Sequence, residues 1–149
     1  MLISRFVIKS SLMINSKARS FVMIMITVGL SALLLRTVIQ KVIIYNIERN
    51  QSLAQVNLKL FYTALENYAK DNKGVYPTDI KQLTKGNPVY LERDYLSVPS
   101  VRGYEYDCRR LDATGYNCSA APTNCNLTGK KVFTISTGGL IISEDCDKK

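Results

Sequence analysis

The side chains that could carry chemistry in this chain are cysteines, carboxylates, lysines and tyrosines, because its 149 residues include no histidine and no tryptophan. Histidine is the commonest general base and a frequent metal ligand, so its absence removes the usual starting point for a catalytic site. No nucleophile stands at a recognisable spacing from a base, and no cluster has the spacing of metal ligands. The sequence therefore predicts that the protein is not an enzyme and has no catalytic, cofactor-binding or metal-binding residues.

The four cysteines all lie beyond residue 100, at Cys108, Cys118, Cys125 and Cys146. Their even number and the lack of a C-x-x-C pair favour two structural disulfides over a metal site, a redox pair or free thiols. Three connectivities are possible. We favour Cys108–Cys118 across a hairpin and Cys125–Cys146 near the C-terminus, where the bond would close a loop of about 20 residues and contribute about 3 kcal/mol.

Charged clusters near the C-terminus suggest two further kinds of binding site. Glu144, Asp145 and Asp147 could attract calcium, but they lack the alternating oxygen ligands of an EF-hand loop, and a solvated tail explains them. Solvent exposure likewise explains three basic pairs that could bind DNA, which are Arg109-Arg110, Lys130-Lys131 and Lys148-Lys149. We therefore expect no bound cofactor and disfavour nucleic acid as a partner.

The first 20 residues form a basic leader. The chain has a formal net charge of +8, and this leader holds four cations and no acid, at Arg5, Lys9, Lys17 and Arg19. Only half of the net charge belongs to the rest of the chain, which weakens the case for binding to nucleic acid. The charge of the leader instead indicates how the chain is oriented in a membrane.

An apolar helix follows the leader. From Phe21 onward 15 residues carry no charge, which corresponds to about 22 Å of helix and is too short to span a bilayer alone. The apolar character resumes after Arg36, and a helix that continues to Ile44 would cover about 36 Å if Arg36 and Lys41 snorkel to the interface. No clear small-x-small cleavage site is present, so we predict a retained transmembrane helix over residues 21–45 rather than a cleaved signal peptide. The positive-inside rule then places the leader in the cytoplasm and the C-terminal part outside.

Residues 46–73 are predicted to continue this helix as an amphipathic half. Apolar residues recur there at helical spacing on one face, at Ala54, Leu58, Phe61, Leu65 and Tyr68. Gly74 and Pro77 supply the stop signals. We expect the apolar stripe to be the face on which the chain's own sheet packs.

Residues 74–149 are predicted to form a loop with a short helix, followed by a disulfide-bonded antiparallel sheet. Thr78 or Asp79 can cap a short helix that ends near Lys85, and Asp79 with Gln82 resembles a capping box. The stretch between Pro88 and Pro99 is typical of a loop. Strand patterns occupy residues 104–108, 116–119, 132–136 and 140–143, with turns at 112–115 and 137–139. The predicted fold class is α+β, with a long N-terminal helix, transmembrane and then amphipathic, packed on a small C-terminal antiparallel sheet.

The order of these elements resembles type IV pilins and the pseudopilins of type II secretion systems. The closest stretch is LKLFYTALENYAKDNKGVYP, from Leu58 to Pro77, which resembles the end of the long pilin helix and its following turn. The resemblance implies that prepilin peptidase cuts between Ser20 and Phe21 and that Phe21 is then N-methylated. It also implies storage in the inner membrane, an assembly platform, and partners that are copies of the chain or other pilin-like subunits.

Three positions depart from the family pattern. Ser20 stands where the leader usually ends in glycine, Met25 stands where the family has glutamate, and the region of Val42 lacks the usual helix-bending proline. In the family that glutamate is thought to neutralise the N-terminal amine of a neighbouring subunit, so Met25 removes one means of registration. The chain would then be a minor subunit, such as one at a filament tip, or a divergent pilin-like protein.

The resemblance implies a structural subunit of a type IV pilus or a type II secretion pseudopilus. Its helix would enter the filament core and its head domain would form the surface. The alternative is a permanently anchored single-pass membrane protein whose extracytoplasmic domain binds a ligand or DNA.

Overall fold

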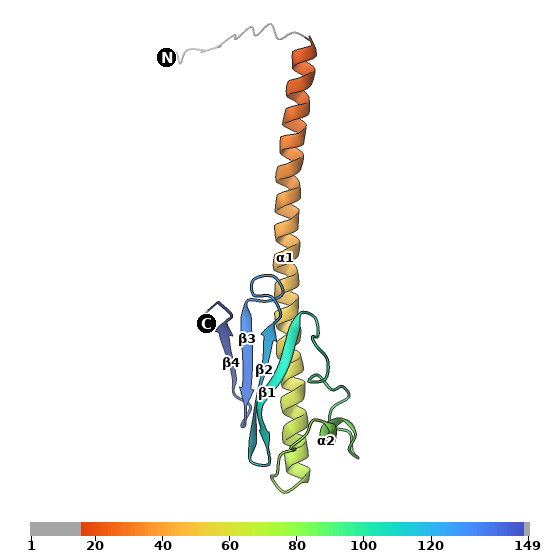
Figure 1. The fold of residues 1–149 in the computed structure, drawn as a ribbon, viewed down its shortest axis with the longest axis vertical. Helices are drawn as coiled ribbons and strands as arrows, with labels where there is room; N and C mark the ends of the chain where they lie inside the picture. The colour runs from red at the N-terminus through yellow and green to blue at the C-terminus, as the bar shows by residue number, and fades with distance from the viewer. Residues whose placement is uncertain (1–15, 148–149) are drawn as a thin grey trace, which may run out of the picture. The chain divides into compact units, whose positions relative to one another are not determined.

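The structure is a computed structural model that describes residues 16–147, with side chains described from residue 21 onward. The elements are α1 (Ser16–Asp71), α2 (Lys81–Thr84), β1 (Tyr104–Asp112), β2 (Gly115–Pro122), β3 (Lys131–Ser136) and β4 (Ile141–Asp145), as Figure 1 shows. One long apolar N-terminal helix and a small C-terminal antiparallel sheet form the predicted α+β arrangement.

The long helix starts earlier and stops earlier than predicted. It begins at Ser16 rather than at Phe21, because the residues between them contain no helix breaker, and it ends at Asp71. Lys73 and Gly74 both take positive φ angles, of 57° and 84°, and the Gly74 N–H donates to the Ala69 carbonyl at 2.7 Å. The terminator is therefore a left-handed turn of two residues that caps the last free carbonyls, rather than Gly74 alone.

The chain divides into two compact units, residues 1–40 and residues 41–149. In the first unit every described side chain, from Phe21 to Gln40, is exposed. The second unit, called the head below, starts a few residues before the boundary predicted at residue 45, and its first buried residue is Ile47.

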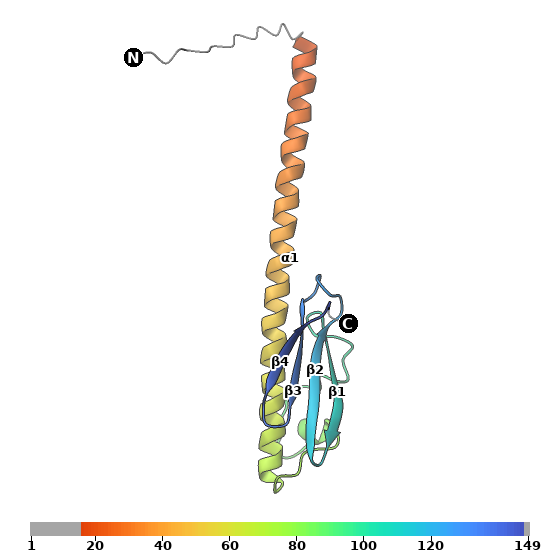
Figure 2. The ribbon, with the colours of Figure 1, turned by 90° about the vertical axis from the view of Figure 1, so that its left-hand side faces the viewer.

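The sheet is a four-stranded antiparallel meander in the order β1-β2-β3-β4. It lies along one side of the part of α1 that belongs to the head, as the two side views show (Figures 1 and 2). Gly138 and Gly139 form the β3–β4 turn with φ angles of 91° and 79°, as the Gly-Gly pair predicts. A register shift between Cys108 and Arg110 leaves Arg109 as an extra residue in β1.

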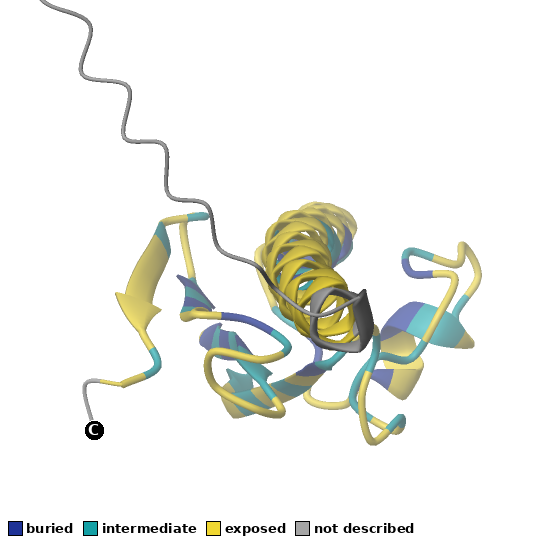
Figure 3. Ribbon diagram, turned by 90° about the horizontal axis from the view of Figure 1, so that it is seen from above, coloured by how far each residue is buried: buried dark blue, intermediate teal, exposed yellow. Residues whose placement is uncertain are grey.

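The core of the head fills the space between α1 and the sheet. Leu58 and Leu65 from α1 are buried against Tyr104, Tyr116 and Phe133 from the strands. By contrast, four of the five residues of β4 are exposed, and this strand appears yellow in Figure 3. The core therefore rests on β1–β3, and β4 is a lightly packed edge.

The short helix α2 differs from its prediction. It spans only four residues, and its N-cap is Ile80, which makes no side-chain cap hydrogen bond. The Asp79 carboxylate instead accepts from the Lys81 N–H at 2.9 Å, and the Gln82 side-chain oxygen accepts from the Thr78 N–H at 3.0 Å. The predicted capping box is thus wrong, because each side chain accepts from an N–H one residue before the expected donor. The chain turns at residues 78–80 before helical hydrogen bonding begins.

Candidate functional site

The exposed surface of α1 is the candidate functional site. The helix is long and apolar enough to cross a membrane, although an N-terminal signal sequence has the same character. In the first unit the large apolar side chains are all roughly half or more exposed, from Phe21 through Ile39. No described part of the first unit covers this surface, which leaves it open to lipid or to another helix.

The hydroxyl groups of the apolar segment bond to their own helix. Thr27, Ser31 and Thr37 each donate to the carbonyl three residues earlier, at 2.8, 2.9 and 2.8 Å. A hydroxyl that is hydrogen-bonded in this way adds little to the free energy of placing the helix in an apolar environment, and its donor is not available to a neighbouring helix. A partner helix would therefore meet this segment through apolar packing.

The predicted cleavage site lies at the edge of the described side chains. Ser20 falls within α1, but its side chain is outside the described residues. Phe21 and Met25 are exposed on the helix. Cleavage after Ser20 and methylation of Phe21 stay predictions.

In the head, α1 carries two apolar faces. One packs on the sheet: Ala54, Leu58, Phe61 and Leu65 are buried, and Tyr68 is half-buried at the rim of the core. This is the packing that their helical spacing predicts.

The second face is exposed and was not predicted. Tyr45, Val56 and Leu60 are 63%, 48% and 51% exposed, and at 100° per residue they fall within about 60° of one another. Leu60 lies about 160° around the helix from Leu58, so these exposed residues are nearly opposite the buried face, and the exposed Arg49 shares their sector. We call Tyr45, Val56 and Leu60 the outer stripe. The sequence could have indicated the outer stripe, because these three apolar residues do not belong to the face that is predicted to be buried.

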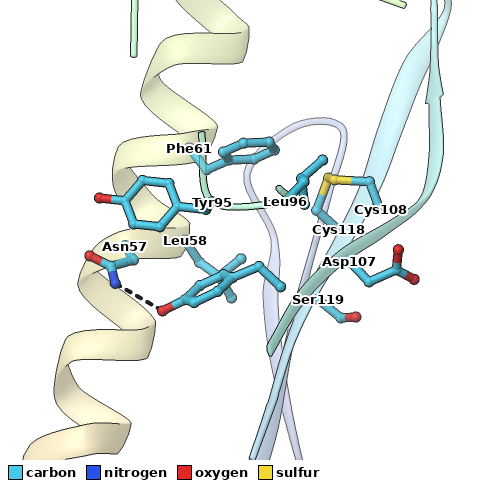
Figure 4. Close-up of a pocket in the computed structure, with 10 residues that line it drawn as sticks. Asn57, Leu58, Phe61, Tyr95, Leu96, Asp107, Cys108, Cys118 and Ser119 are labelled. Atoms are coloured by element: carbon cyan, nitrogen blue, oxygen red, sulfur yellow. Dashed lines mark hydrogen bonds between the residues drawn. A yellow bond between two sulfur atoms is a disulfide. The ribbon is translucent and has the colours of Figure 1, made fainter. Parts of the chain in front are cut away.

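The Cys108–Cys118 disulfide lies across β1 and β2, where the two residues are direct partners in the ladder. Figure 4 shows it facing Leu58, Phe61 and Leu96. The space that these side chains leave is about 10 Å³, which is the size of a single water molecule. The region is thus a packed core and offers no room for a small-molecule ligand.

The second disulfide joins Cys125 to Cys146, so the connectivity is the one the sequence favours. Asp147 lies close to both sulfur atoms, and its carboxylate accepts from the Asn126 amide at 2.9 Å. Both cysteines are committed to the disulfide and have no thiolate to offer a metal ion. Glu144 and Asp145 are adjacent on β4 and both line a hollow that Arg109 also lines, and Glu144, Asp145 and Asp147 do not form a group of three converging carboxylates among the described residues.

The basic pairs do not form a common patch among the described residues. Arg110 forks onto Asp112, with Nε 2.8 Å from the carboxylate, and this contact holds the pKa of Asp112 well below its usual range. Lys131 is the ladder partner of Asp145, and Arg109 shares a hollow of the outer sheet with Glu144. Lys148-Lys149 lies outside the described residues. Acidic side chains therefore lie among these basic residues, as is usual on a solvent-exposed protein surface.

Glu66 is a structural residue that the sequence analysis missed. Its carboxylate accepts from the hydroxyls of Tyr116 at 2.9 Å and Tyr76 at 3.2 Å. Burial, reinforced by the Glu66 charge, raises the pKa of both tyrosines above the ordinary value of 10.0. The cluster ties α1 to the following loop and to β2. Helical periodicity alone assigns Glu66 to a solvent face, because the tyrosines that cover it come from elsewhere in the chain.

A hollow that is open to solvent lies beside the end of α1. It measures about 560 Å³ and is lined in part by Tyr68, Asp71, Gln82 and Tyr90. The Tyr90 hydroxyl donates to Asp71 at 2.8 Å, and the rings of Tyr68 and Tyr90 meet edge to face at 5.5 Å. These contacts hold the loop against the helix and leave a polar, aromatic depression at the surface.

No protein-family model, no curated protein and no solved structure matches the chain. The likeness to pilins and pseudopilins rests on the residues quoted for it, chiefly Leu58 to Pro77.

Proposed function

We propose that this protein is a structural subunit of a filament of the type IV pilus or type II secretion pseudopilus kind. Before assembly it is inserted in the inner membrane through residues 21–45, with the head on the extracytoplasmic side. Prepilin peptidase and an assembly platform act on it, and its partners in the filament are copies of itself or other pilin-like subunits.

The observation that carries this proposal is the outer stripe. A membrane anchor explains apolar residues up to about Ile44, but Val56 and Leu60 lie in the head, on a helix whose opposite face already packs on the sheet. A filament core of packed helices would cover the outer stripe as well as the face that packs on the sheet. The outer stripe is therefore the surface expected to contact a neighbouring subunit.

The test replaces two of the three residues of the outer stripe, neither of which belongs to the buried core. Val56→Ser with Leu60→Ser should leave the unfolding free energy of the head nearly unchanged, because both side chains are already exposed. The double substitution should lower the amount of protein in sheared filaments by about tenfold or more, since each lost apolar contact is worth about 1.5–3 kcal/mol on burial. Val75→Ser, an exposed apolar residue off the stripe, is the matched control and should change neither quantity.

The N-terminus of the mature protein gives an independent check. Mass spectrometry should find N-methylated Phe21 in the filament fraction. An intact residue 1, together with protein that is found only in membranes and never in sheared filaments, would count against a filament subunit.

An uncleaved protein that stays in the membrane would favour the alternative, which is a permanently anchored single-pass protein whose head binds a ligand or DNA. The observation in its favour is the hollow beside Tyr68 and Tyr90, whose volume of about 560 Å³ lies within the range of small-molecule sites. Its openness to solvent and the exposed Val56 and Leu60 favour the filament instead.

A further inference from the structure

The outer stripe lies among basic side chains. The part of α1 that belongs to the head carries four cations, which are Lys41, Arg49, Lys59 and Lys70. At 100° per residue, all four fall within about 60° of Val56, the middle residue of the outer stripe. Each side chain is exposed, and none makes an ion pair with a residue that the structure describes. We call these four residues the basic face.

The same part of the molecule offers few carboxylates to balance this charge. Glu66 and Asp71 each accept a hydrogen bond from a tyrosine hydroxyl of the same chain, at 2.9 and 2.8 Å. Glu48 is the only other acidic residue of α1, and it lies about 80° around the helix from the middle of the outer stripe. The neighbouring loop adds Glu92 and Arg93, whose charges cancel. Among the described residues, the basic face therefore keeps its positive charge.

The α1 helix of a second copy is a poor partner for this surface. Two copies that meet through the basic face place cations against cations, which is unfavourable. The rest of α1 has the same shortage of acids, because Glu48 is the first acidic residue of the chain and Glu66 and Asp71 are already hydrogen-bonded. A helix core that consisted of copies alone would thus contain more cations than available carboxylates.

The surface instead fits a partner that has both apolar and acidic side chains. Apolar residues of the outer stripe lie among the cations, so a partner must bury apolar area as well as neutralise charge, and a nucleic-acid backbone supplies only the charge. From Lys41 to Lys70 the basic face extends about 44 Å along α1. A contact of this length suits another long helix.

We propose that the outer stripe and the basic face bind a long helix of a different subunit, in which aspartate and glutamate side chains flank an apolar stripe. The proposal rests on the proposed filament function. Of the two kinds of partner named there, it selects another pilin-like subunit over a copy of the chain. The outer stripe supplies the apolar contact, and the charges decide which subunits meet.

Carbodiimide cross-linking tests the partner in native filaments, because it joins a lysine amine directly to a carboxylate that touches it. Sheared filaments that contain the full-length protein are treated, and the linked peptides are located by mass spectrometry. The expected product joins Lys59 or Lys70 to an aspartate or glutamate in a helix of another pilin-like subunit. Lys59→Arg with Lys70→Arg keeps the charge, so it should reduce this product by about tenfold or more and leave incorporation into filaments within about twofold.

A charge-reversed copy of the chain provides a defined probe. Full-length protein with Arg49→Glu and Lys59→Glu keeps the outer stripe and adds carboxylates beside it. In detergent at low salt, tagged unsubstituted protein should retain this probe at least about fivefold more than a second unsubstituted copy, and high salt should remove the difference. Lys81→Glu with Lys85→Glu, a matched reversal of exposed residues outside α1, should be retained no better than the unsubstituted copy.

The possible results separate the partner from the function. Cross-links from Lys59 or Lys70 to carboxylates of another copy, or equal retention of the probe and the unsubstituted copy, would overturn the choice of partner and leave the filament function standing. Full-length protein that binds DNA, and loses that binding with Arg49→Glu and Lys59→Glu, would likewise overturn it. Unsubstituted protein that never enters filaments would overturn both.

Discussion

At the residue scale, Glu66 shows how a charged side chain comes to stabilise this fold. It is partly buried on α1, and two tyrosine hydroxyls from the following loop and β2 donate to it. Tyr116 is almost fully buried, so its hydroxyl depends on this acceptor. A buried hydroxyl without a partner costs about 1–3 kcal/mol.

Replacing Glu66 should therefore destabilise the head in a graded way. Glu66→Ala removes both acceptor oxygens and should lower the unfolding free energy by about 1–3 kcal/mol, whereas Glu66→Gln keeps one carbonyl oxygen and should cost clearly less. Urea unfolding followed by circular dichroism measures both. Adding Tyr116→Phe to Glu66→Ala should recover part of the loss, because the more deeply buried of the two hydroxyls is then no longer left without an acceptor. Equal losses for the alanine and glutamine variants would show that the hydrogen bonds contribute little.

At the element scale, local patterns predict this fold well wherever one face is buried. The spacing of Ala54, Leu58, Phe61 and Leu65 predicts their burial because a helix repeats every 3.6 residues. The Gly138-Gly139 turn follows from its need for positive φ angles. The start of α2 and the role of Glu66 could not be predicted in the same way, because loop turns and distant tyrosines decide them.

The two disulfides should differ in the part of the structure that they hold. They span 10 and 21 positions in sequence, so the chain-entropy model expects about 3 kcal/mol from each. Their surroundings differ, however, because Cys118 is buried in the core and the Cys125–Cys146 pair secures the end of exposed β4.

Removing each disulfide should therefore give distinct hydrogen-exchange patterns. Cys108→Ala with Cys118→Ala should speed exchange across β1–β3 and lower the unfolding free energy by about 3 kcal/mol or more, since a core contact is lost as well. Cys125→Ala with Cys146→Ala should speed exchange in β4 and leave β1–β3 protected. Uniform acceleration in the second variant would show that β4 is integral to the cooperative unit.

At the scale of the whole molecule, the chain combines a segment without a core of its own and a head with one. Every described side chain up to Gln40 is exposed, and the first buried residue is Ile47. The sequence predicts this division, because residues 21–35 carry no charge on any face, whereas apolar residues from 46 onward alternate with polar ones at helical spacing. The outer stripe breaks this scheme, because its apolar side chains lie in the head but are left exposed.

A fragment that begins at Lys41 should fold on its own, because it retains every residue of the buried core. Its sheet should unfold cooperatively on heating, at a temperature close to that of the head in the detergent-solubilised full chain. A shorter fragment that begins at Val56 would lack Ile47 and Ala54, and with them the hydrogen bond from the Asn50 amide to the Thr128 carbonyl. Each lost core side chain costs about 1–3 kcal/mol, so this fragment should melt well below the longer one. A fragment from Lys41 that fails to fold would mean that the head depends on the apolar segment, and the separation of anchor from head on which the filament proposal relies would be wrong.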